Sequence, residues 1–302
     1  MKSMFEFTPP LIDGVSASKV FLPHGITIST IFEYLCQHFE HIKIEEWQQR
    51  FDDGLIYSAD GKKLKSDSPY TANTHIFYYR FLAHEVHVPF QYEILFENED
   101  LLVVDKPHFL TMSPTGQYVQ ETLLVRLKKQ TGYKELTPIH RLDRETAGVV
   151  LFCKKASARG IYQQLFAERK VQKIYHAIAV YRPELHFPQT VKLHLEKGLP
   201  FYTMQVNLEK PSNTETLIEL LEHNKSHAKY LLKPQTGKQH QLRVHLNYLG
   251  IPILNDEFYP VIAHKSSDDF SNPLQLLAKE IFFNDPVSKQ EMHFNSKLEL
   301  TL

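Results

Sequence analysis

Long apolar runs and cysteines are scarce in this sequence of 302 residues. No apolar stretch approaches the ~20 residues that a membrane-spanning helix needs, and the N-terminal region lacks the apolar core of a signal peptide. The two cysteines, Cys36 and Cys153, are too few for a disulfide framework and stand in no CxxC pair. These absences argue against a membrane protein and a disulfide-stabilised secreted domain. We therefore expect a soluble, cytoplasmic protein with reduced thiols.

A strong net charge is also missing, because the formal charge is −1. The charge is unevenly distributed, however. Residues 1–90 carry 8 Lys/Arg and 11 Asp/Glu, whereas residues 124–175 carry 12 Lys/Arg and only 4 Asp/Glu. A local excess of eight positive charges is enough for a phosphate-binding face, and a solvated helix face is the alternative. The composition, with 42% apolar and 23% charged residues, is that of an ordinary globular protein.

The chain is predicted to have three parts. Residues 1–83 form a small unit with amphipathic helices at 28–39 and 44–51 and short strands around 55–57 and 74–81. Two helices with a hairpin resemble the alpha-L RNA-binding module, although the pattern is also that of a common packing unit. Residues 84–91 lack a helical period and read as an extended connector. Residues 92–302 form the larger unit.

The larger unit alternates strands with helices. The pattern favours an α+β fold, a mixed and mostly antiparallel sheet with helices between the strands. Expected strands lie at 92–96, 101–105, 149–153, 174–180, 216–221 and 228–233, and expected helices run from 157 to before 171 and from 239 to 248.

One carboxylate stands out. Asp143 occurs in the segment HRLDRETAG, directly before an apolar strand. The flanking Arg141 and Arg144 favour the ionised carboxylate. An ionised, positioned carboxylate can attack a sugar carbon or stabilise the cation formed there. A structural Asp–Arg pair explains the same residues and is the favoured interpretation when the segment is taken alone.

Four other segments accompany it in a fixed order: VVDKP at 103–107, KIYHA at 173–177, TGKQHQLRVHL at 236–246, and LGIPI at 249–253, which is followed by Asp256 and Tyr259. Together with HRLD they resemble the RluA family of RNA pseudouridine synthases over about residues 91–294. The resemblance implies the pseudouridine synthase fold for residues 92–302. It also implies isomerisation of a uridine in ribosomal or transfer RNA, with no cofactor and no metal.

The resemblance also implies roles for individual residues. Asp143 is the essential carboxylate, and Arg243 pairs with it. Tyr175 stacks on the target base and is a candidate base for the ring proton, although an ordinary phenol with a pKa near ~10 needs activation for that role. The expected substrate-binding residues are His140, which contacts phosphate or packs, Arg141, which replaces the extruded nucleotide in the stack, and Leu242 and Val244, which wall the uracil pocket.

Three other functions fit the sequence less well. A non-catalytic RNA-binding protein would not need the set Asp143, Tyr175 and Arg243. A carbohydrate hydrolase needs a second carboxylate, and Glu145, two residues away, need not converge with Asp143. A zinc site at His240 and His245 is disfavoured, because helical metal pairs prefer a spacing of four. We expect an RNA-modifying monomer that needs structured RNA and no obligate protein partner.

Overall fold

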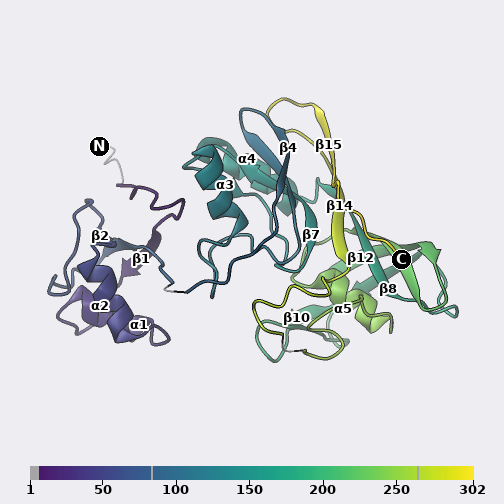
Figure 1. The fold of residues 1–302 in the computed structure, drawn as a ribbon, viewed down its shortest axis with the longest axis horizontal. Coiled ribbons are helices and arrows are strands. Elements are labelled where there is room, and N and C mark those ends of the chain that lie inside the picture. Colours follow the sequence, from purple (N-terminus) through teal and green to yellow (C-terminus); the bar gives the residue numbers. More distant parts are fainter. Residues whose placement is uncertain (1–6, 83, 264) are drawn as a thin grey trace. The chain divides into compact units, whose positions relative to one another are not determined.

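The structure is a computed structural model that describes residues 7–82, 84–263 and 265–302 (Figure 1). No helix of these residues is long and apolar enough to span a bilayer. Nor do three His, Cys, Asp or Glu side chains of this part of the chain meet as a metal-binding group.

The chain divides into two compact units. The first comprises Met1–Glu85 with Val125–Lys134, and the second comprises Val86–Leu124 with Glu135–Leu302. Nothing in the sequence pattern indicated that a segment from the middle of the chain would group with the N-terminal residues. The boundaries at 83 and 92 stay a prediction about independent domains.

The first unit is a three-stranded antiparallel sheet with two helices. Its core buries the side chains of Leu35, Trp47 and Ile76. Thr30 caps the first helix, since its hydroxyl accepts a hydrogen bond from the Glu33 N–H at 3.1 Å. The sheet order is β1-β3-β2. The elements are β1 (Ser18–Leu22), α1 (Ile31–His38), α2 (Ile44–Asp52), β2 (Ile56–Ser58) and β3 (Thr74–Tyr78). Both predicted helices are present, and β1 was not predicted.

The second unit is built on a ten-stranded sheet whose main path is β4-β5-β7-β14-β8-β13-β12-β9. Every pairing in it is antiparallel except that of β7 with β14, so the predicted α+β fold with a mostly antiparallel sheet is confirmed. The strands of this sheet are β4 (Glu93–Glu97), β5 (Leu101–Lys106), β6 (Thr137–Pro138), β7 (Ala147–Cys153), β8 (Gln172–Val180), β9 (Gln189–Leu193), β12 (Thr214–His223), β13 (His227–Pro234), β14 (Leu276–Asn284) and β15 (Glu291–Asn295).

Three helices and a small hairpin complete the elements. They are α3 (Leu123–Thr131), α4 (Ala156–Ala167), α5 (Gln241–Tyr248), and the hairpin of β10 (Leu195–Lys197) and β11 (Met204–Val206). In Figure 1, α4 lies beside β7 and α5 lies beside β12. Each covers a separate apolar core. Leu151 and Tyr162 belong to the core under α4, and Tyr230 and Leu246 belong to the core under α5.

The two halves of the large sheet meet where β14 lies between β7 and β8. The parallel pairing with β7 covers only two residue pairs, one of which is Gly148 with Ala278. Gly148 has φ +115°, and a Cβ placed on it would lie 2.2 Å from the carbonyl oxygen of Ala278. Only glycine fits such a close backbone approach. Because β7 follows the Asp143 segment directly, this junction sets where that segment enters the sheet.

Candidate active site

A cavity of about 600 Å³ opens between the loop before β7, the end of α4, the start of β8 and the segment leading into α5. A volume of this size is typical of small-molecule and nucleotide sites. Six of the seven residues predicted from the sequence line it: His140, Arg141, Asp143, Tyr175, Leu242 and Arg243.

The seventh, Val244, does not line the cavity. It is 3% exposed and belongs to the apolar core beneath α5. Consecutive residues of a helix point about 100° apart, so the residue after Arg243 turns away from the side that faces the cavity. The structure therefore places Val244 in the core behind Leu242, outside the lining of this cavity.

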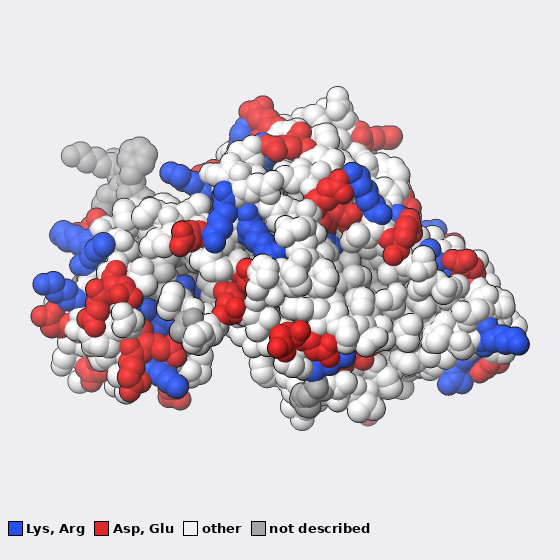
Figure 2. Space-filling view, viewed as in Figure 1, with Lys and Arg blue, Asp and Glu red and all other residues white. Residues whose placement is uncertain are grey.

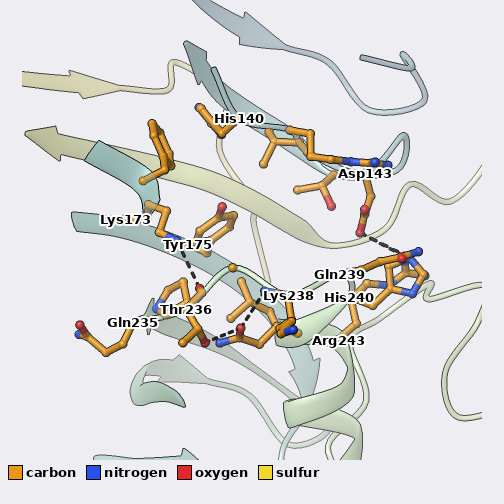
Figure 3. Close-up of a pocket in the computed structure, with 18 of the residues that line it drawn as sticks. His140, Asp143, Lys173, Tyr175, Gln235, Thr236, Lys238, Gln239, His240 and Arg243 are labelled. Atoms are coloured by element: carbon orange, nitrogen blue, oxygen red, sulfur yellow. Dashed lines mark hydrogen bonds and ion pairs between the residues drawn. The ribbon is translucent and has the colours of Figure 1, made fainter. Parts of the chain in front are cut away.

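Asp143 faces two basic side chains across the cavity (Figure 3). Its Oδ2 atom lies 3.6 Å from Nη1 of Arg243 and 3.7 Å from Nε2 of His240. The carboxylate is 22% exposed, so solvent and substrate can reach it. Both distances are within ion-pair range and longer than a hydrogen bond, which leaves the carboxylate oxygens available for a reacting group.

The end of β5 holds the loop that follows Asp143. Lys106 is fully buried and donates hydrogen bonds to the carbonyls of Pro107 and Leu110 at 2.9 Å and of Arg144 at 3.1 Å. His108 Nδ1 contacts the carbonyl of Glu145 at 2.6 Å, which fixes the proton on that nitrogen. Burial lowers the pKa of Lys106 to about 7, against the opposing charges of Glu145 and Asp143. The turn is therefore fixed by backbone contacts that do not use the Asp143 side chain.

Arg243 is bound first of all to Asp256. Its Nε and Nη2 donate to the two carboxylate oxygens at 2.7 and 2.6 Å, and both side chains are 1% exposed. Burial acts to lower the pKa of Arg243, but Asp256 and then Asp143 outweigh it, so the pKa is raised. Nη1 is buried and has no hydrogen-bond partner among the described residues. That nitrogen is the one that faces Asp143.

The guanidinium of Arg243 is also held by aromatic rings and by the backbone around Asp256. It lies over the rings of Phe258, at 4.8 Å, and Tyr259, at 5.5 Å. Oδ1 of Asp256 accepts hydrogen bonds from the N–H groups of the same two residues. Asp256 and Tyr259 were recognised from the sequence only as motif positions. Their spacing along the chain carried no sign of this arrangement.

His240 is fixed by Tyr259. Its Nδ1 lies 2.9 Å from the Tyr259 hydroxyl, which also accepts a hydrogen bond from the Met204 N–H at 2.8 Å. When the Tyr259 hydroxyl donates to Nδ1, the ring proton of a neutral His240 lies on Nε2, the nitrogen nearest Asp143. Burial lowers the pKa of His240, opposed by the charge of Asp143. In place of a zinc ligand, the sequence favoured a solvated or hydrogen-bonded histidine, and the structure shows a hydrogen-bonded one that lines the cavity.

Tyr175, on β8, lies between the two ends of the cavity in Figure 3. Burial raises its pKa, and the negative charge of Asp143 raises it further. The environment therefore stabilises the protonated phenol. The activation that a role as proton acceptor would need is not supplied by these surroundings.

His140 and Arg141 differ sharply in their surroundings. His140 stacks on Phe166 with ring centroids 4.7 Å apart, and its Nε2 accepts a hydrogen bond from the Leu151 N–H. Burial and then Lys173 lower its pKa to about 3, so the ring is neutral and packs into the wall. Arg141 is exposed at the cavity and makes no hydrogen bond or ion pair with any described residue.

The basic stretch 124–175 is divided between the two units. Its part Val125–Lys134 groups with the first unit. Among the others, Lys154 pairs with Glu97 and Lys155 with Asp100. On the face drawn in Figure 2, basic and acidic side chains lie next to one another. Acidic residues outside the stretch thus neutralise these two lysines, which the charge count of the sequence does not show.

Comparison with known proteins is consistent with this site. The family described as RNA pseudouridylate synthase matches residues 100–248. The human pseudouridylate synthase RPUSD2 is 36% identical over 174 residues, which span 56% of this chain and 31% of the human protein. The dual-specificity RNA pseudouridine synthase RluA of Haemophilus influenzae is 32% identical over 210 residues, which span 68% of this chain and 92% of that enzyme.

Two solved structures have the fold of the second unit. Human RNA pseudouridylate synthase domain containing 4 matches with a TM-score of 0.52 and 27% identity, over 68% of this chain and 88% of its own. Human RNA pseudouridylate synthase domain containing 1 has a TM-score of 0.54 at 24% identity, over 68% of this chain and 83% of its own. Together with the RluA relative, these matches confirm the resemblance carried by the five motifs: the chain belongs to the RNA pseudouridylate synthase family, in its RluA-type group, and is an isomerase.

Proposed function

We propose that this enzyme converts a specific uridine of structured ribosomal or transfer RNA to pseudouridine, with Asp143 as the essential carboxylate. One observation carries the proposal. Among the described residues that line the 600 Å³ cavity, Asp143 is the sole carboxylate, and Arg243 and His240 face it at 3.6 and 3.7 Å. Glu145, the candidate second carboxylate of a hydrolase, instead pairs with Arg144 at 3.3 Å and does not line the cavity.

The target nucleotide enters the cavity by leaving its stack, which is the general requirement for chemistry on a base in structured RNA. The exposed Arg141 stands at the cavity, in a position to fill the space that the nucleotide leaves. Uracil then packs against the ring of Tyr175 and the side chain of Leu242. A neutral phenol is a good stacking surface, and the raised pKa of Tyr175 keeps it neutral.

The reaction exchanges one bond to the ribose for another. The bond between C1′ and N1 of uracil breaks while the Asp143 carboxylate attacks C1′ or stabilises its positive charge. The ring turns within the cavity and C5 bonds to C1′, which breaks any bond from Asp143 to C1′. The proton of C5 then leaves to solvent, and N1 takes up one proton. No atom is added and no electron is transferred. Arg243 and His240 keep the carboxylate oriented through the cycle, since Asp256 and Tyr259 hold both in place.

The class of RNA is inferred from the family. The relative from Haemophilus influenzae is named as a dual-specificity enzyme, and we extend to this chain ribosomal or transfer RNA as the substrate class. A non-catalytic RNA-binding protein is the alternative. Such a protein does not need an accessible carboxylate. The Asp143 oxygens face Arg243 and His240 without a hydrogen bond to either, which suits a reacting group.

Tritium release from RNA that carries 5-tritiated uridine tests the proposal, because the C5 hydrogen leaves only when the new bond forms. Total RNA from cells that lack the protein serves as substrate. We expect release by the wild type, none by Asp143→Asn, and wild-type release by the matched control Asp67→Asn, an exposed carboxylate of the first unit. Release by Asp143→Asn at the wild-type rate, or no release by the wild type, contradicts the proposal.

A further inference from the structure

Four cationic side chains line the cavity without an acidic partner. Among the described residues, none of the four makes an ion pair. Lys173 donates one hydrogen bond, to the carbonyl of Thr236 at 3.3 Å. The four are Arg141, Arg169, Lys173 and Lys238.

Other basic residues of the same unit, in contrast, are paired with acidic side chains. Lys170 pairs with Glu168 at 2.6 Å, and Lys154 pairs with Glu97 at the same distance. Arg243, which also lines the cavity, is neutralised by Asp256. Folding thus pairs many basic groups but leaves a concentrated positive charge on this wall. Like charges that share a wall repel one another, so an anionic ligand is the natural counterpart.

Lys173 lies against the segment that carries Lys238, since its Nζ donates to the Thr236 carbonyl and would lie 3.7 Å from a Cβ placed on Gly237. Arg169 follows α4, Lys173 lies at the start of β8, and Lys238 lies in the segment before α5. Lys173 and Tyr175 are two residues apart on one strand, so their side chains share a face of it. In Figure 3, Lys173 and Thr236 lie on one side of Tyr175, and Asp143 lies on the other. Tyr175 thus lies between Lys173 and the reacting carboxylate.

The three cations also differ in depth. Lys173 is partly buried, whereas Arg169 and Lys238 are exposed. The backbone of Arg169 is left-handed, with φ +57°, where the chain turns out of α4. Burial lowers the pKa of Lys173, and no carboxylate counteracts this. The positive charges thus run from inside the cavity to its rim, which is the path a polymer chain takes when one nucleotide is inserted and the next remains outside.

We propose that Arg169, Lys173 and Lys238 bind a backbone phosphate of the substrate RNA next to the target nucleotide. The proposal rests on the proposed function, because it takes the ligand to be the strand whose uridine reaches Asp143. These cations position the strand and do not touch the reacting atoms. Their contribution therefore falls on substrate binding and not on the chemical step.

The test compares two triple variants of the full chain. Arg169→Gln, Lys173→Met and Lys238→Gln together remove the three cations. Lys192→Gln, Lys225→Gln and Lys289→Gln remove three exposed lysines of the same unit that lie outside the cavity. Tritium release from the RNA described above gives KM and kcat at several salt concentrations. A double variant, Arg169→Gln with Lys238→Gln, leaves the partly buried Lys173 intact and covers the case in which the triple variant does not fold.

We expect KM of the cavity variant to rise at least about tenfold with kcat within about twofold of the wild type. The dependence of log KM on log salt should become shallower by about 0.7 for each phosphate of a single strand that the variant no longer neutralises. The control variant should keep the wild-type KM and salt dependence.

The phosphate-site proposal is contradicted if the cavity variant keeps the KM and the salt dependence of the wild type. It is also contradicted if the variant has a lower kcat and an unchanged KM. Either result leaves the proposed function intact, since the wild type still releases tritium. Failure of the proposed function shows itself separately, as absence of release by the wild type.

Discussion

Arg243 binds Asp256 through two nitrogens and turns its third, Nη1, toward Asp143. The two buried side chains form a bidentate pair, the geometry in which a guanidinium is most firmly oriented. The pair with Asp256 therefore fixes the position of the Arg243 guanidinium. The longer contact places this fixed positive charge beside the Asp143 carboxylate. Asp143 needs no hydrogen bond of its own to the arginine in order to stay oriented in a positive field.

Replacing Asp256 should impair both stability and catalysis. Asp256→Asn leaves the Arg243 charge buried with only Asp143 to balance it, and breaking a buried pair costs about 3 kcal/mol or more. A small displacement of Arg243 should lower kcat for tritium release about 100-fold. Urea unfolding measures the first effect and single-turnover release the second. The exposed Asp268→Asn is the matched control, and a fully active Asp256→Asn would contradict the role assigned to this carboxylate.

The Tyr259 hydroxyl should matter although it does not reach Asp143. Tyr259→Phe leaves the Met204 N–H and the His240 ring without their partner, at a cost of about 1–3 kcal/mol. With Nδ1 no longer held, His240 can adopt the other tautomer, and kcat should fall about tenfold. Tyr202→Phe is the control, because its ring packs on Phe258. Equal kcat for both variants would show that the tautomer of His240 is not set through Tyr259.

Acid should destabilise the protein through His245. Burial lowers its pKa from 6.5 to about 4. The unfolded chain therefore binds more protons than the folded one between pH 4 and 6.5, so the stability rises with pH across this window and is lost as the pH falls through it. Its Nε2 lies 2.8 Å from the Thr214 hydroxyl.

His245→Gln removes the titrating group while keeping a donor for Thr214. The slope of the free energy of unfolding against pH should become shallower by up to about 1.4 kcal/mol per pH unit within that window. His223→Gln, an exposed histidine, is the control. Urea unfolding at half-unit steps from pH 4 to 7 measures the slopes, and parallel curves for wild type and His245→Gln would rule the effect out.

Two glycines should respond to alanine in opposite directions. In Gly148→Ala the new Cβ meets the Ala278 carbonyl at 2.2 Å and the backbone keeps a φ of +115°, so we expect a loss of more than about 4 kcal/mol or a failure to fold. Gly160→Ala lies within α4 with no neighbour within 4 Å of the new Cβ, and should stabilise by about 0.5–1 kcal/mol. Thermal unfolding of both variants checks the pair, and a well-folded Gly148→Ala would show that the junction tolerates expansion.

The sequence predicted the residues of the site better than their contacts. Ordered motifs identified Asp143, Tyr175 and Arg243, which do line one cavity. They did not reveal that Asp256 is the main partner of Arg243, or that His240 faces Asp143. Such pairings depend on how distant segments pack against one another in the folded chain. The spacing of residues along the sequence does not predict that packing. The charge count of the basic stretch likewise does not show that Lys154 finds an acid partner, Glu97, 57 residues away.

Regular elements were predictable where the apolar pattern was local. The helices α1 and α5 and the strands β8 and β13 agree with their predicted ranges to within a few residues. The elements that the pattern missed include α3, β1 and β14. β14 is buried over much of its length, LLAKEIFFN, and lacks the strict alternation that marks a strand with one face in water. Tertiary packing, not local sequence, makes it a strand.

The place of β14 has a consequence for how the enzyme is made. Translation must proceed from Cys153, the end of β7, to Leu276 before the strand that joins β7 to β8 exists. At 5–20 residues per second that interval is roughly 6–25 s. Until then the Asp143 loop and the Tyr175 strand lack the strand that lies between them, and the nascent chain has no completed site. The site can therefore form only late in synthesis, after Leu276 has been added to the chain.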